Sequence, residues 1–194
     1  MIAARGRSSA RDDATTDRTL RSILKHARRA VPGGDEAGIV LVTDGVAAMA
    51  AGTAHMARQL DRTQCESGRG PGLEAMRQLQ VFNVGCLASS SSSWPDFSWV
   101  AARLGVASSL SVPVTWAGRA LGVLGVYSSR PDAFAGCEAA GIEVAREAAL
   151  ALASLQGRET LHRRRRWHGF DAPAVLPAGR STFGVVWPVA DATL

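Results

Sequence analysis

A glycine-rich run at residues 64–76, "QCESGRGPGLEAM", is the first stretch whose residue types could do chemistry. Free backbone N–H groups at the start of a helix can hold a phosphate, and glycines let that phosphate come close. A Walker-type phosphate loop ends in Gly-Lys-Ser/Thr, whereas Gly72 is followed by Leu73 and Glu74. Glu66 would also place negative charge beside the phosphate. The run therefore predicts a turn that aims a helix, in preference to a nucleotide site.

The cysteines and histidines offer no ligand set. Cys65, Cys86 and Cys137 are odd in number and include no Cys-x-x-Cys pair, which argues against a disulfide framework or a zinc site and is typical of a reducing cytoplasm. The four histidines, among them His55 after a predicted strand, show no metal-ligand spacing. The serines at 89–93 lack a Gly-x-Ser-x-Gly pattern. We therefore expect no metal, no cofactor and no enzymatic activity.

Two aromatic or basic groups remain open to a binding role. Trp94, Phe97 and Trp99 lie close together, and they could either cap the core or roof a ligand cavity. A basic run followed by Trp167 has the composition that binds phosphate and stacks a base. Cations also suit the carboxyl end of a helix, and this second interpretation is preferred. The basic run consists of Arg163, Arg164, Arg165 and Arg166.

Composition limits the class of protein. The chain has 194 residues, 46% of them hydrophobic, and a net charge of +5 that is concentrated at its two ends around a mildly acidic middle. The total charge is therefore a weak indication of nucleic-acid binding. No apolar stretch approaches the roughly 20 residues that span a bilayer, and the first residues lack a signal-peptide segment, so we expect no membrane contact. The arginine and alanine enrichment is typical of a GC-rich bacterial genome.

The elements that must position these groups follow from periodicity and turn residues. Helices are predicted from about residue 17 to Val31, from Pro71 to Leu79, from near Pro95, and over residues 138–156. A short strand is predicted at "VFNVG", and hairpins at Asp44-Gly45 and Ala117-Gly118. Gly122 and Gly125, inside the second hairpin, indicate a close approach of another backbone or a ligand.

Together these elements predict an α+β domain with a mainly antiparallel sheet. Residues 1–15 are predicted to be a disordered start, residues 16–157 a single domain, and residues 158–194 a basic, weakly structured tail.

"GLEAM" after "ESGRGP", the stretch "LGVASSLSVPVTWAGRALGVLGVYSSRPDAF" and the closing alanine-rich helix resemble a GAF domain. More narrowly, they are similar to the actinobacterial GAF domains that precede an RNA-binding ANTAR domain in transcription antitermination regulators. The resemblance covers about residues 17–156. It implies a PAS-related sheet of about six antiparallel strands with helices on both faces, and long first and last helices packed together.

The resemblance also implies a ligand pocket and a dimer. By analogy the pocket, between the sheet and the middle helices, is largely apolar and has walls formed by Phe82, Cys86, Trp94, Phe97, Leu110 and Val112. The terminal helices of such domains often form a homodimer bundle. The residues expected in it are Leu20, Ile23, Leu24, Ala27, Ile142, Ala145, Ala149 and Leu152.

Departures from related families narrow the expected function. The signature of cyclic-nucleotide-binding members, the cysteine–histidine pair of bilin-binding members and the loop cysteine of free-methionine sulfoxide reductases have no match here. Residues 157–194 are too short and proline-rich for an ANTAR domain. We therefore expect a cytoplasmic, non-enzymatic sensor module in signal transduction. An RNA-binding antitermination regulator acting through the basic tail is the alternative, and a sulfoxide reductase using Cys65 and Cys86 is the least favoured one.

Overall fold

The computed structural model describes the backbone of residues 3–167 and 185–186 and the side chains of residues 14–155. In chain order the elements are α1 (Ala3–Ala30), β1 (Glu36–Thr43), β2 (Val46–Gly52), α2 (His55–Ser67), α3 (Pro71–Gln78), β3 (Phe82–Val84), η1 (Ala88–Ser90), α4 (Pro95–Arg103), β4 (Ser108–Trp116), β5 (Arg119–Ser128), α5 (Glu138–Trp167) and β6 (Val185–Val186). The predicted α+β class is confirmed.

The strands form one antiparallel sheet of six strands in the order β3-β4-β5-β1-β2-β6. Both predicted hairpins are present. Their turns place Asp44 and Gly45, and Ala117 and Gly118, at positive φ, the backbone twist that suits two-residue hairpin turns. Gly122 and Gly125 lie on β5, which is an interior strand between β4 and β1.

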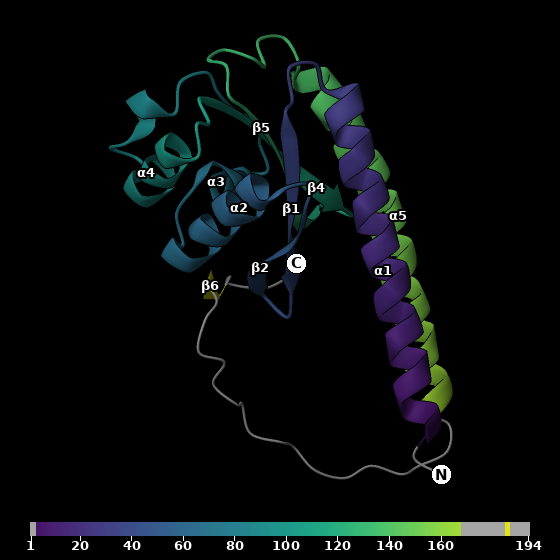
Figure 1. The fold of residues 1–194 in the computed structure, drawn as a ribbon. Helices are drawn as coiled ribbons and strands as arrows, with labels where there is room; N and C mark the ends of the chain where they lie inside the picture. The colour runs from purple at the N-terminus through teal and green to yellow at the C-terminus, as the bar shows by residue number, and fades with distance from the viewer. Residues whose placement is uncertain (1–2, 168–184, 187–194) are drawn as a thin grey trace, which may run out of the picture.

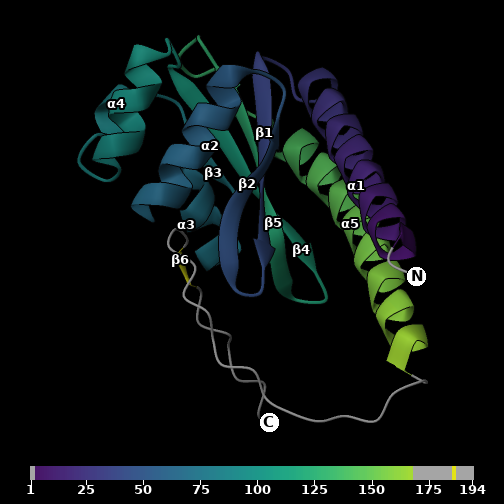
Figure 2. The same ribbon diagram turned by 60° about the horizontal axis from the view of Figure 1, so that its bottom comes forward.

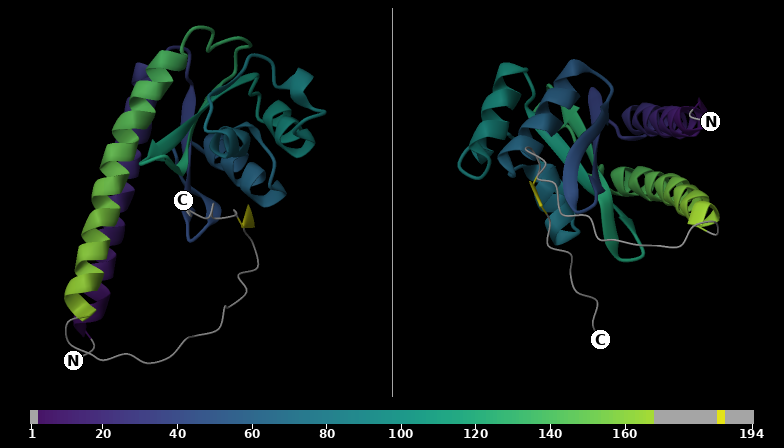
Figure 3. Two further views of the ribbon diagram at one scale, coloured as in Figure 1. Left: turned by 180° about the vertical axis from the view of Figure 1, so that it is seen from behind. Right: turned by 90° about the horizontal axis from the view of Figure 1, so that it is seen from below.

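Helices cover both faces of this sheet (Figures 1 and 2). α1 and α5 lie side by side and antiparallel on one face, and their far ends extend beyond the sheet (Figure 3). α2, α3 and α4 cover the opposite face. Because side chains alternate along a strand, β1 and β5 contribute apolar side chains to both faces of the sheet. Among the described residues, one core cluster lies under α1 and α5, and two lie under α2, α3 and α4.

The structure differs from the predictions at three helices. α1 begins at Ala3 where a disordered start was predicted, and α5 runs to Trp167, into the predicted tail. The extension of α1 is rich in alanine and arginine, the extension of α5 is rich in arginine, and neither contains proline. α2 was not predicted, because two of its buried residues, Asp61 and Gln64, are polar and hide its amphipathic pattern. Residues 168–184 and 187–194 of the predicted tail lie outside the described residues.

Val123 offers a direct test of the sheet. Its side chain is buried on β5 between α3 and β1, in contact with the core that includes Val40 and Leu73. We expect Val123→Asp to unfold the domain, since an unpaired buried carboxylate costs several kcal/mol, a large part of a domain's total stability. Circular dichroism during thermal unfolding measures this. Thr115→Asp, at an exposed position of β4, is the control and should melt close to the wild type.

Candidate functional site

α2 carries a buried polar side chain pair that reaches the sheet. Asp61 is 1% exposed, and its Oδ1 accepts hydrogen bonds from Tyr127 Oη at 2.5 Å and from Gln64 Nε2 at 2.9 Å. Tyr127 stands on β5 and is fully buried. The three side chains therefore connect α2 to the centre of the sheet through buried hydrogen bonds. These bonds are charge-assisted when Asp61 is ionised and neutral when it is protonated.

Gln64 continues this connection to α3. Its Oε1 accepts the backbone N–H groups of Gly72 at 3.0 Å and Leu73 at 3.3 Å, in the first turn of the helix. A Cβ added at Gly70 would lie 2.5 Å from Gln64 Cβ, and one at Gly72 would lie 2.8 Å from its Oε1. The glycine-rich run is thus a turn that makes room for the Gln64 amide. The N–H groups where a phosphate would bind are occupied by that amide.

Burial changes the ionisation of this group. Desolvation raises the pKa of Asp61 to about 7, and the hydrogen bonds from Tyr127 and Gln64 oppose that rise. Burial, together with the neighbouring Asp61 carboxyl, raises the pKa of Tyr127 well above its usual value. Asp61 Oδ2 has no hydrogen-bond partner in the described part of the chain, and it lies so close to Gly38 on β1 that a Cβ there would overlap it. Asp61 therefore changes charge near neutral pH while enclosed by the protein.

Three serine hydroxyls share the same side of the sheet. Ser109 and Ser111 are buried on β4, Ser98 is buried on α4, and their hydroxyl oxygens have no hydrogen-bond partner among the described residues. Ser109 is paired across the sheet with Tyr127, and Ser111 with Gly125. We call Asp61, Gln64, Ser98, Ser109, Ser111 and Tyr127 the buried polar cluster. Buried hydroxyls in proteins normally have hydrogen-bond partners. Hydroxyls without such a partner therefore indicate a site where a bound molecule could form hydrogen bonds with them.

The structure brings together three of the predicted pocket residues. Phe82 on β3 and Trp94 before α4 meet edge to face, with ring centroids 6.2 Å apart. Phe97 is fully buried on α4, with its ring 6.5 Å from that of Tyr127. These aromatic rings lie on the α2–α4 side of the sheet, as the buried polar cluster does. Cys86, the fourth of the predicted residues, is exposed in the loop after β3.

Leu110 and Val112 were predicted in the same pocket, and their placement is a correction. Both side chains point to the α1–α5 face, where a Cβ added at Gly141 would lie 3.0 and 2.9 Å from them. In the strand "SSLSVPV" the serines and the aliphatic residues alternate, so one face receives the hydroxyls and the other the aliphatic side chains. That alternation was the available signal for Ser109 and Ser111, and the expected apolar wall is polar.

The predicted dimer residues also need correction. All except Ile142 are buried within the chain itself, where α1 and α5 pack on each other and on β1, β4 and β5. An amphipathic stripe contacts the nearest apolar partner, which here is the protein's own sheet. The buried residues are Leu20, Ile23, Leu24, Ala27, Ala145, Ala149 and Leu152.

The thiols differ sharply in reactivity. Cys65 is buried under β1 and β2, and desolvation, assisted by Asp61, raises the pKa of its thiol to about 12. Cys86 is exposed, and the pKa of its thiol is lowered by the backbone N–H and then the hydroxyl of Ser89. Because the thiolate is the nucleophile, Cys65 is unreactive at neutral pH.

The described part of the chain holds neither a metal-binding cluster nor a membrane-spanning helix. Among the side chains that the structure describes, no group of three or more His, Cys, Asp or Glu is arranged to hold a metal ion. None of the helices in that part of the chain has a stretch long and apolar enough to cross a membrane.

Comparison with known proteins gives one family. Residues 13–153 match the family described as GAF domain. No curated protein matches the chain. Similar solved structures include a type II free methionine-R-sulfoxide reductase from Thermoplasma acidophilum (16% identity, TM-score 0.56, covering 74% of this chain and 95% of that one). A domain of a two-component sensor histidine kinase protein from Sinorhizobium meliloti is also similar (18% identity, TM-score 0.59, 75% and 94%). At these identities the structures support the fold alone.

The raised pKa of Asp61 predicts a specific pH dependence of stability. Between about pH 4 and pH 7 the folded chain keeps a proton that the unfolded chain has lost. The stability that protonated Asp61 gives the folded state is thus fully present below about pH 4. This stability is lost as the pH rises from about 4 to about 7, and it changes no further above about pH 7. In that window the unfolding equilibrium constant should grow by up to about tenfold per pH unit.

Asp61→Asn should remove this loss, because an amide keeps an acceptor for Tyr127 and does not ionise. Urea unfolding at pH 5 and pH 8 measures the difference, with Asp96→Asn, an exposed carboxyl on α4, as the control. The assignment is wrong if the wild type and Asp61→Asn lose the same stability between the two pH values.

Proposed function

Because this chain belongs to the GAF family, we propose that it is a non-enzymatic sensory and regulatory module that binds a small polar molecule at the buried polar cluster. GAF domains are mostly sensory. The proposal places this one in the bacterial cytoplasm, where its three free cysteines suit a reducing environment.

The observation that carries the proposal is the set of unpartnered polar atoms between the sheet and α2–α4. Asp61 Oδ2 and the hydroxyls of Ser98, Ser109 and Ser111 are all enclosed on that side. Each such group lowers stability by about 1–3 kcal/mol when it has no partner. A ligand with several hydrogen-bonding groups would remove that penalty, and the rings of Trp94 and Phe97 would cover its apolar part.

The arrangement favours sensing over catalysis. A dithiol mechanism needs a thiolate, and the Cys65 thiol is buried with its pKa raised to about 12. The similarity to a free methionine-R-sulfoxide reductase is one of fold. A change at the cluster would instead be transmitted mechanically, since Gln64 and Asp61 join α2, α3 and β5 by direct hydrogen bonds.

RNA binding is the second candidate, and with it the finer resemblance to antitermination regulators. The observation in its favour is that α5 continues as a helix through Arg163–Arg166 to Trp167. Four consecutive arginines followed by a tryptophan have the composition that binds phosphates. The candidate remains second because cations at the carboxyl end of a helix also stabilise it.

Alanine substitutions at the unpartnered serines test the small-molecule proposal. Ser109→Ala and Ser111→Ala each remove a buried hydroxyl that no described residue contacts by a hydrogen bond. Without ligand, each variant should be more stable than the ligand-free wild type by about 1 kcal/mol. As purified, each variant should lose any small molecule that native mass spectrometry detects on the wild type.

Ser108→Ala is the matched control, because Ser108 Oγ donates a hydrogen bond to the Arg130 carbonyl at 2.7 Å. That variant should lose about 1 kcal/mol of stability and keep the ligand. A wild-type chain that carries no small molecule, or serine variants that retain as much of it as the wild type, would contradict the proposal.

We also propose that the chain forms a homodimer through the outer surface of the α1–α5 pair. Leu150 on α5 is 52% exposed and Ile142 on the same helix is also exposed, so both side chains are accessible to a second copy of the chain. Leu150→Glu should convert a dimer to a monomer in size-exclusion chromatography with light scattering, without lowering the melting temperature. Trp99→Glu, on α4 at the opposite face, should leave the mass unchanged. A dimer that persists in Leu150→Glu would refute this interface.

A further inference from the structure

A row of basic side chains on α1 faces the end of strand β2. Arg21, Lys25, Arg28 and Arg29 are spaced so that they lie along one side of the helix. Arg58 on α2 stands across from them, and together these five side chains line a groove of about 700 Å³ between α1 and β2. The groove lies between α1 and the β2 end of the sheet, and none of its lining residues belongs to the buried polar cluster.

The floor of this groove is built from small residues. Ala50, Ala51 and Gly52 of β2 form it beside the base of Leu24. Arg58 is held in place, because its Nη1 donates to the Gly52 carbonyl oxygen at 2.9 Å. The shape leaves room between the cationic groups for a ligand, and its size falls in the range of small-molecule sites.

Carboxylates neutralise only part of the positive charge. Arg21 pairs with Asp17 at 2.9 Å, and Arg28 lies 3.9 Å from Glu36. Lys25 and Arg29 make no ion pair with any residue whose side chain the structure describes. Asp17 is the single carboxylate among the described residues lining the groove, against five cations. A concave surface with such an excess of one sign concentrates ions of the opposite charge.

The arrangement of the cations indicates what kind of anion fits. From Arg21 to Arg29 the row extends along α1 by roughly 12 Å, at about 1.5 Å per residue. A row suits a chain of negative groups better than a single carboxylate. Arginine also matches the geometry of phosphate oxygens with two hydrogen bonds at a time. A chain of phosphates therefore complements both the spacing and the chemistry of the groove.

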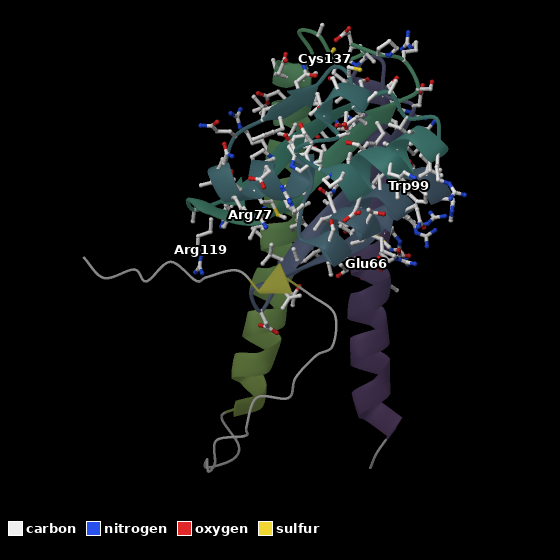
Figure 4. The ribbon with its side chains drawn as sticks, turned by 90° about the vertical axis from the view of Figure 1, so that its left-hand side faces the viewer. Glu66, Arg77, Trp99, Arg119 and Cys137 are labelled. Atoms are coloured by element: carbon white, nitrogen blue, oxygen red, sulfur yellow. The ribbon has the colours of Figure 1, made fainter. Side chains whose placement is uncertain are left out.

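The same features disfavour nucleic acid. Single strands are held by bases stacked on aromatic rings, and the described lining contains no aromatic side chain. The exposed Trp99 lies on α4, outside the lining (Figure 4). A duplex is too wide to enter a groove of this volume. We therefore propose that the α1–β2 groove is a binding site for a compact polyphosphate, such as inorganic tripolyphosphate or the phosphate chain of a nucleotide.

Isothermal titration of the full chain with tripolyphosphate tests this site. Lys25→Gln combined with Arg29→Gln removes the two cations that have no carboxylate partner, and both side chains are exposed, so folding should be unaffected. We expect this variant to bind at least tenfold more weakly than the wild type. Orthophosphate should bind the wild type more weakly than tripolyphosphate, and ATP should bind about as well as tripolyphosphate.

Two controls lose the same charge elsewhere. Arg103→Gln with Arg119→Gln changes α4 and the β4–β5 turn, where Figure 4 shows Arg119. Arg164→Gln with Arg165→Gln changes the end of α5. Both should bind within about twofold of the wild type. The proposal is overturned if tripolyphosphate does not bind, if all three double variants weaken binding equally, if the α5 variant alone weakens it, or if ATP or duplex RNA binds and tripolyphosphate does not.

Discussion

The hydrogen bonds between Gln64, Asp61 and Tyr127 join elements that the chain brings together from distant positions. Asp61 accepts from Tyr127, which is 66 residues away on β5, while Gln64 accepts the first N–H groups of α3. Removing the Asp61 carboxyl takes away the acceptor of the Tyr127 hydroxyl, and removing the Gln64 amide takes away the acceptor of the Gly72 and Leu73 N–H groups, each at a cost of about 1–3 kcal/mol. The nearby glycines follow from the same contacts, since side chains at Gly38, Gly70 or Gly72 would overlap Asp61 or Gln64.

This constraint gives the two faces of the sheet different roles. The α1–α5 face is packed with aliphatic and small side chains and holds the terminal helices on the sheet. The α2–α4 face encloses hydroxyls, a carboxyl group and aromatic rings. Buried polar groups without partners have a stability cost that an aliphatic interior avoids. The same contacts that position α2 and α3 would carry a change at the buried polar cluster to the sheet.

The described basic side chains of α1 lie outside the cores on both faces of the sheet. The basic side chains of α1 are excluded from the core by their charge, yet the edge of β2 and Arg58 turn part of that surface into a groove. Arg119, by contrast, stands at an open turn without such neighbours (Figure 4). Several basic residues of α1 therefore gather at one groove, and the net charge of the whole chain does not reveal this.

Local signals in the sequence were sufficient for much of the fold. Asp44-Gly45 and Ala117-Gly118 mark hairpins because few residues adopt a left-handed backbone, and Pro71 and Pro95 mark helix starts because proline lacks the N–H that a first turn leaves free. These features depend on a few neighbouring residues, and so a sequence pattern can predict them.

Only the tertiary structure decided which polar groups are buried and which apolar ones are available. Asp61 and Gln64 look like surface residues until Tyr127 and the start of α3 close over them. Leu110 was predicted in the pocket under α2–α4, but its side chain lies on the α1–α5 face. Side chains alternate along β4, so the serine hydroxyls take the α2–α4 face instead. Leu24 on α1 proved to be part of the chain's own core. Burial depends on the partner that a side chain meets, and that partner comes from a remote part of the chain.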